Sequence, residues 1–99
     1  MASYKVSIDP ELKDIAAIYI ENRRKELPEL AALYGAGDLD ALRKLGHKLS
    51  GSGGSCGFDR LSELGKELET LAQAGELPGV AGCLDAIKDY LENLEIIYE

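Results

Sequence analysis

The sequence has no tryptophan, one phenylalanine, one histidine and two cysteines, and it contains no long apolar run. The scarcity of aromatic residues argues against a stacking platform for single-stranded nucleic acid. A membrane span needs about 20 consecutive apolar residues, and no such stretch occurs. The start, MASYKVSIDPELKD, has no apolar segment of the kind found in a signal peptide. We therefore expect a cytoplasmic protein in which Cys56 and Cys83 are reduced and act as small apolar residues.

Basic residues are also in the minority. Lys and Arg number 11 against 18 Asp and Glu, which gives a formal net charge of -7. An acidic chain is poorly suited to bind nucleic acid or an anionic membrane, so we expect neither as a partner. A length of 99 residues suits one domain with one modest core. We therefore treat residues 1–99 as a single domain and expect a monomer.

The first amphipathic segment is expected to begin at Asp9–Pro10, where an Asp cap precedes a Pro in the first turn. It runs to Gly35 and should kink or break near Glu26, because Pro28 disrupts a regular helix. Its apolar stripe is less regular than those that follow. The stripe is predicted from Ile15, Tyr19, Leu27 and Leu30, while Ile18 and Ile20 fall outside it. This extra apolar surface is either core or docking surface.

Three further helices follow, each with a start signal. The second begins after Asp38, the third near Asp59 with Gly75 as its stop, and the fourth at Leu77–Pro78. Their apolar stripes comprise Leu39, Leu42, Leu45 and Leu49; Leu61, Leu64, Leu68 and Leu71; and Val80, Cys83, Leu84, Ile87, Tyr90, Leu91, Leu94, Ile97 and Tyr98. Strand signals are weak, so no strand is expected. The prediction is an all-α, up-down antiparallel four-helix bundle, with room for a short extra N-terminal helix or cap before Ile8.

The stretch LGHKLSGSGGSCGFDRL holds the only histidine, His47, among many glycines. Propensity alone would end the helix at Ser50, because each interior Gly costs about 1 kcal/mol relative to Ala. If the helix continues, its geometry gives the glycines two roles. Gly46 and Gly53 lie on the core side, where they let a neighbouring helix approach. Gly51 and Gly54 lie on the same face as an exposed His47, and Gly57 is placed to end the helix.

The charges around His47 are predominantly positive. Arg43, Lys44 and Lys48 lie within one turn, and no acid occurs between Asp40 and Asp59. An exposed imidazole in an open cationic patch suits an anion such as a phosphoryl group. The alternative is an ordinary surface histidine on a solvated helix face.

The stretch LGHKLSGSGGSCGFDRLSELGKELE resembles the signature of histidine-containing phosphotransfer (HPt) domains. That pattern is a His, then Leu and Gly, small residues, a further Gly and a Leu-rich helix. The matching positions are His47, Leu49, Gly51, Ser52, Gly57, Leu61, Leu64, Leu68 and Glu69. The family commonly has Lys three residues after the histidine, where this chain has Ser50. That hydroxyl can donate a hydrogen bond to a phosphoryl oxygen, but it carries no charge.

The resemblance implies that His47 accepts a phosphoryl group from an aspartyl phosphate on one receiver domain and passes it to an aspartate on another. It implies a phosphocarrier without kinase activity, whose partners are receiver domains of response regulators or hybrid kinases. The receiver would supply Mg²⁺, so no cofactor or metal site is expected on this chain. Arg43, Lys44, Lys48, Ser50, Gly51 and Gly54 would form the phosphoryl and docking environment.

Other classes fit less well. An acyl carrier would need a serine in Asp-Ser-Leu, which is absent. The glycines lack the spacing of a phosphate-binding loop, and one histidine with two distant cysteines does not suggest a metal enzyme. The alternative left open is a small acidic helical carrier, or a partner-binding protein without phosphotransfer. A Met start and a chain that stops with its last helix favour a free-standing carrier.

Overall fold

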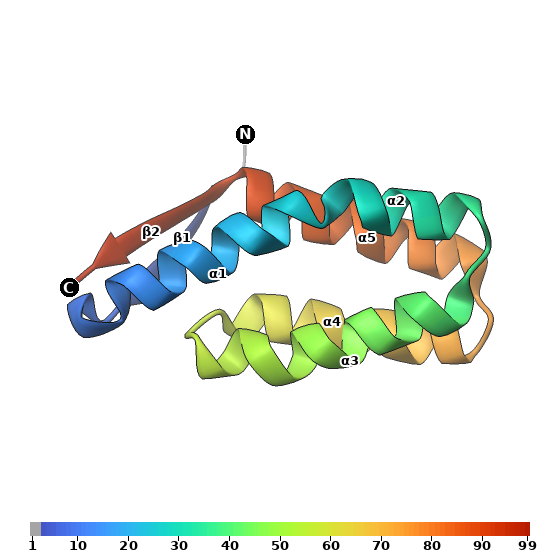
Figure 1. Cartoon of the computed structure of the whole chain (residues 1–99), viewed down its shortest axis with the longest axis horizontal. Helices are drawn as coiled ribbons and strands as arrows, with labels where there is room; N and C mark the ends of the chain where they lie inside the picture. Colours follow the sequence, from blue (N-terminus) through green and yellow to red (C-terminus); the bar gives the residue numbers. More distant parts are fainter. Residues whose placement is uncertain (1–2) are drawn as a thin grey trace.

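Helical segments fold back on one another in sequence order to form an antiparallel bundle (Figure 1). A computed structural model describes residues 3–99. Its elements are β1 (Tyr4–Ile8), a short 3₁₀ helix (Pro10–Leu12), α1 (Lys13–Lys25), α2 (Leu27–Gly35), α3 (Leu39–Ser55), α4 (Asp59–Gln73), α5 (Leu77–Glu92) and β2 (Leu94–Tyr98). Helices α1 and α2 follow one another in the same direction and together form the first arm of a four-helix bundle. The predicted four-helix bundle is confirmed.

The helix boundaries follow the predicted signals. The Asp9 side chain accepts from the backbone N–H of Glu11, although the first turn is 3₁₀ rather than α. Asp38 caps α3 by accepting from the backbone N–H of Ala41 at 3.1 Å. The break falls at Glu26, between α1 and α2, as Pro28 predicts. Gly75 follows α4 with a φ of +74°, a backbone conformation that glycine adopts at little cost.

Helices α3 and α4 are the most closely packed pair in the fold. A Cβ at Gly46 would stand 2.7 Å from both the backbone nitrogen of Glu69 and the carbonyl oxygen of Gly65. A Cβ at Gly53 would stand 2.9 Å from the nitrogen of Ser62. The core role predicted for Gly46 and Gly53 is confirmed. Gly65 belongs to the same contact, since a Cβ there would meet that of Leu49 at 2.6 Å.

The prediction that no strand forms and that the last helix extends to Tyr98 is wrong. Helix α5 ends at Glu92, and Leu94–Tyr98 forms β2, which pairs in parallel with β1 from Tyr4↔Leu94 to Ile8↔Tyr98. The apolar residues near the end fit a helical stripe, but β-branched and aromatic side chains favour a strand when a partner strand is available. Strand β1 occupies the place predicted for an N-terminal helix or cap, and the 3₁₀ helix lies where the first helix was predicted to begin.

The core lies between the helical arms and beneath the small sheet. Its largest fully buried side chains are Tyr90, Phe58, Ile20, Leu42, Leu61, Leu64, Leu68, Ile87, Leu91 and Val80. The stripe predicted for α1 is partly wrong. Ile20 is buried, whereas Ile15 and Ile18 are 59% and 60% exposed. The buried residues of α1 are Ala16 and Ile20, and Tyr19 packs against the core while partly exposed.

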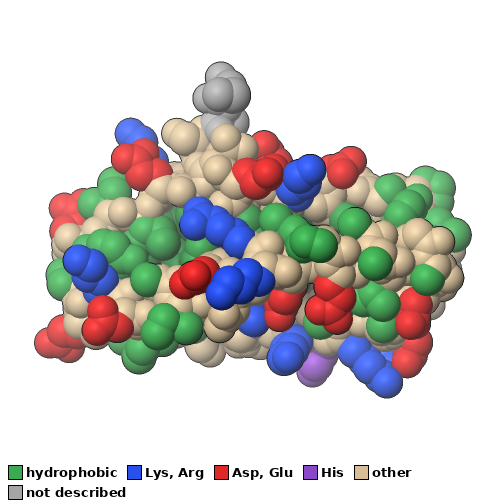
Figure 2. All heavy atoms as spheres, turned by 45° about the horizontal axis from the view of Figure 1, so that its top comes forward, with side chains coloured by type: hydrophobic (Ala, Val, Ile, Leu, Met, Phe, Trp, Pro, Cys, Tyr) green, Lys and Arg blue, Asp and Glu red, His purple; other side chains and the backbone are tan. Residues whose placement is uncertain are grey.

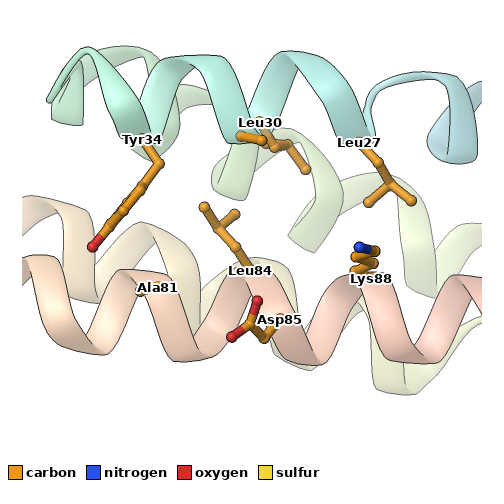
Figure 3. Close-up of a pocket in the computed structure, with 8 residues that line it drawn as sticks. Leu27, Leu30, Tyr34, Ala81, Leu84, Asp85 and Lys88 are labelled. Carbon is orange, nitrogen blue, oxygen red and sulfur yellow. The ribbon is translucent and has the colours of Figure 1, made fainter.

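A shallow cleft of about 240 Å³ separates α2 from α5 (Figure 3). Leu27, Leu30 and Tyr34 point into it from α2, opposite Leu84 on α5, with Asp85 and Lys88 nearby. This cleft is lined by α2 and α5 alone, so it contains none of the residues around His47. Within residues 3–99, no helix is long and apolar enough to cross a membrane.

Candidate functional site

His47 lies on α3, which continues through the glycines to Ser55. Propensity would end this helix at Ser50, but close packing against α4 supports the additional turn. The helix then ends in a Schellman motif, in which the N–H of Phe58 bonds the carbonyl of Gly53 and the N–H of Gly57 bonds that of Gly54. Gly57 has a φ of +91°, as expected for a glycine just past a helix end. The side chain of His47 is 77% exposed, and it is visible in purple at the lower edge of Figure 2.

The imidazole is held from one side by α4. Nδ1 of His47 lies 3.0 Å from Oε2 of Glu69. A carboxylate can only accept a hydrogen bond, so Nδ1 carries the proton and donates it. Nε2 of the neutral ring then keeps its lone pair and is free to act as a nucleophile. The close contact of Gly46 with the backbone of Glu69 brings this carboxylate within reach.

The predicted cationic patch is present but partly neutralised. The guanidinium of Arg43 lies 2.9 Å from one oxygen of Asp40, and the ammonium of Lys44 lies 3.1 Å from the other. Hydrogen bonds from Arg43 and Lys44 hold the pKa of Asp40 below its usual range. Lys48 is exposed and directly follows His47. The sequence between Asp40 and Asp59 holds no acid, but the fold places the carboxylates of Asp40 and Glu69 beside these cations and His47.

The predicted clear approach to the imidazole is present. A Cβ added to Gly51 would have no heavy atom within 4 Å. At Gly54 the nearest atom would be the hydroxyl oxygen of Ser62, at 3.8 Å. Both glycines are exposed, and both lie on the face that carries His47. Ser50 is half-buried, and its carbonyl accepts from the hydroxyl of Ser62 at 2.6 Å, so this position borders α4.

The nearby serines have structural partners. The hydroxyl of Ser52 donates to the carbonyl of Lys48 and contacts that of Tyr19 at 2.7 Å. The hydroxyl of Ser55 donates to the carbonyl of Gly51. Within residues 3–99, no group of three metal-ligating side chains comes together.

The chain matches the Hpt domain family over residues 14–96. This match covers most of the chain, which therefore belongs to the Hpt domain family. Hpt domains are phosphocarriers that transfer phosphoryl groups through a histidine in phosphorelays, and they have no kinase activity. Neither the curated proteins nor the solved structures that were searched contained a match to the chain.

Sequence reasoning found His47 and its open face but not the role of Glu69. The two residues are 22 positions apart on different helices, and no local spacing connects them. The available signal was indirect. Gly46 and Gly65 predict that the two helices cross closely. Such a crossing brings His47, which follows Gly46, near Glu69, which lies one turn after Gly65.

Proposed function

We propose that His47 is the phosphoryl acceptor of this Hpt domain and that Nε2 is the atom that reacts. The observation that carries the proposal is the exposed imidazole, which is held through Nδ1 by Glu69 while Nε2 remains free. Fixing one nitrogen defines both the tautomer and the ring orientation. In-line phosphoryl transfer depends mainly on such positioning.

The proposed step exchanges one bond to phosphorus for another. Nε2 attacks the phosphorus of an aspartyl phosphate, the P–O bond to the aspartate breaks, and the aspartate leaves as a carboxylate. The ring becomes a phosphoimidazolium, whose positive charge the Glu69 carboxylate stabilises through Nδ1–H. The reverse step returns the phosphoryl group to an aspartate of a second receiver domain.

The receiver docks, in this proposal, on the face that holds His47, Gly51 and Gly54. Helix α1 adds an apolar border to that face. Tyr19 of α1 contacts Ser52 of α3 through their hydroxyls, and the exposed Ile15 and Ile18 lie within one turn of Tyr19. Apolar side chains beside an open glycine surface suit contact with another protein. Lys48 would steer the acidic pocket of the receiver towards the imidazole.

We further propose that the protein acts as a cytoplasmic monomer, with Mg²⁺ bound by the receiver and with neither nucleic acid nor membrane as a partner. The net charge of -7 supports the last two points, because like charges repel phosphate backbones and anionic lipids.

Phosphotransfer from a panel of phosphorylated receivers, read by intact mass, tests the proposal. We expect one phosphoryl group on the parent protein, labile in acid and stable in base, and none on His47→Gln. Phosphate that persists on His47→Gln would overturn the assignment of His47. A parent protein that binds receivers but gains no phosphate would favour the partner-binding alternative.

A further inference from the structure

A second concave surface runs along β1, and the phosphotransfer site does not use it. It has a volume of about 560 Å³, which is within the range of ligand pockets. One wall is the strand itself, from Ser3 to Ser7. The other lining residues are Gly57, Asp59 and Arg60 at the start of α4, and Tyr90 of α5. No residue of β2 lines it, so this β1 groove lies along the edge of β1 that faces away from β2.

The edge of β1 that faces the groove carries backbone N–H and C=O groups that could pair with another strand. The N–H of Tyr4 bonds the carbonyl of Asn93, and the carbonyl of Ile8 accepts from the N–H of Glu99. Successive residues of a strand direct their backbone groups to opposite sides. Tyr4 and Ile8 therefore direct theirs towards β2, whereas Lys5 and Ser7 direct theirs into the groove. Such an edge is a template for another extended chain.

The groove also contains a buried polar group without a partner. Tyr90 is 2% exposed, and its hydroxyl has no hydrogen-bond partner among residues 3–99. Burial raises the pKa of Tyr90 to about 12, so the hydroxyl stays neutral and able to donate. By contrast, the ring of Tyr4 lies against that of Tyr90, yet its own hydroxyl donates to Asp89 at 2.6 Å. A buried hydroxyl without a partner is costly, and a ligand carbonyl in the groove would relieve that cost.

We propose that the β1 groove binds an extended peptide segment of another protein, which adds to the outer edge of β1 as a third strand. The unpaired N–H and C=O groups of Lys5 and Ser7 select a polypeptide backbone, and the hydroxyl of Tyr90 selects an acceptor beside it. A second copy of this chain is disfavoured as the occupant, because two molecules of charge -7 repel each other. The groove itself carries Lys5 and Arg60 against Asp59, so its own charges nearly cancel and favour a neutral peptide. A third strand would also strengthen a sheet that has only two.

Peptide selection on the whole protein tests this proposal. Random nine-residue peptides displayed on phage are selected against the parent protein, and the enriched peptides are synthesised and titrated. The key variant is Ser7→Pro, which removes a backbone donor on the outer edge and leaves the side facing β2 intact, a place where strands tolerate proline. Ser7→Ala is its matched control, because it removes the hydroxyl and keeps the N–H. Lys5→Pro repeats the test at the other outward position if Ser7→Pro fails to fold.

The expected result is enrichment of neutral peptides with no proline in the middle. Their affinity should fall about tenfold or more in Ser7→Pro and remain unchanged in Ser7→Ala. The amides of Lys5 and Ser7 should gain hydrogen-exchange protection when the peptide binds. Tyr90→Phe should weaken binding by several-fold while making the free protein more stable, a combination that a purely structural role for the hydroxyl would not produce.

Three results would overturn the proposal. The first is the absence of enriched peptides. The second is equal binding by the parent protein and Ser7→Pro. The third is a dimer of the parent protein that Ser7→Pro dissociates, which would make a second copy the occupant. His47→Gln should bind the peptides as the parent does, so failure of the phosphotransfer assignment and failure of this proposal are distinguishable.

Discussion

Oε2 of Glu69 accepts a hydrogen bond from Nδ1 of His47 over 3.0 Å, and this bond joins the two most closely packed helices of the domain. The contact depends on glycine. Gly46 precedes His47, and its bare Cα leaves space for the backbone of Glu69. The orientation of the His47 ring is therefore set by helix packing, and its partner acid comes from α4 rather than from the helix of the histidine.

Removal of this carboxylate should slow transfer without removing the acceptor. Glu69→Ala should lower the phosphotransfer rate about tenfold, the effect of losing a charge-assisted hydrogen bond of about 1.5 kcal/mol. Glu69→Gln should lower it less, because its amide oxygen still accepts. Glu67→Ala, which changes an exposed acid on the same helix, is the control. Equal rates for Glu69→Ala and the parent would show that the contact does not assist the chemistry.

Gly51→Gln should separate stability from function. Since the position is open and helical, Gln should raise the free energy of unfolding by up to about 1 kcal/mol. Phosphotransfer should nevertheless fall sharply, because the side chain would occupy the space where we propose that the receiver docks. Gly82→Gln makes the same change at an open position on α5 and should preserve the rate. Thermal melts and transfer kinetics on the two variants provide the comparison, and an unimpaired Gly51→Gln would contradict the steric role.

Asp40→Asn should release two cations at once. Arg43 and Lys44 both pair with this carboxylate, so its neutralisation should leave them free to attract an acidic receiver. We expect a faster association at low salt and no difference at about 1 M salt, where screening acts over about 3 Å. Asp85→Asn on α5 changes the net charge equally and should have a much smaller effect. If both variants speed association to the same extent, net charge rather than local pairing is responsible.

Stability should fall at alkaline pH because two buried groups favour their protonated forms. Burial raises the pKa of Cys83 from 9.0 to about 11 and that of Tyr90 from 10.0 to about 12. Each contribution is fully present below the unfolded pKa and is lost as pH rises through the folded value. Urea unfolding at a series of pH values should therefore show a decline that begins near pH 9.

Tyr90→Phe is the matched variant for this decline. It should remove the part of the alkaline loss of stability that is due to Tyr90. Because it also deletes an unpaired buried hydroxyl, it should raise the free energy of unfolding at neutral pH by about 1 kcal/mol. A free energy of unfolding that stays constant from pH 8 to pH 11 would contradict the assignment of the two pKa values.

Gly65→Ala should destabilise the bundle. Its methyl group would meet Leu49 at 2.6 Å and the backbone nitrogen of Ser50 at 2.7 Å. Overpacking of this kind costs about 2 kcal/mol, or a fall in Tm of about 10 °C for a domain of this size. Gly82→Ala has no neighbour to displace and should raise the Tm slightly. A Gly65→Ala variant that melts with the parent would show that the two helices can separate without cost.

Local signals predicted most of the fold. Asp38, Pro28 and Gly75 each act within a few residues of their own position, so the ends of the helices could be read from the chain. The pairing of β1 with β2 could not, because each strand has five residues and their contacts span nearly the whole sequence. Residues 94–98 fit the apolar pattern of a helix and of a strand equally well. They form a strand because β1 is available to pair with them.

The features of the site also fall into those that local sequence predicts and those that depend on the fold. The exposure of His47 and the two classes of glycine followed from the geometry of one helix. Glu69 and the pairing of Asp40 with two cations needed three-dimensional information. Local sequence could place Asp40 one turn before Arg43 and Lys44, but it could not show that both side chains turn towards it.

The parallel pairing of β1 with β2 also orders events during synthesis. Ribosomes add about 5–20 residues per second from the N-terminus, so β1 emerges long before its partner. The contacts between α3 and α4 are local and can form as soon as both helices are available. Strand β1 must wait until residues 94–98 have left the ribosome, and both of its edges are unpaired during that time. A nascent chain therefore exposes a strand with two unpaired edges, and synthesis of residues 94–98 is the step that covers one of them.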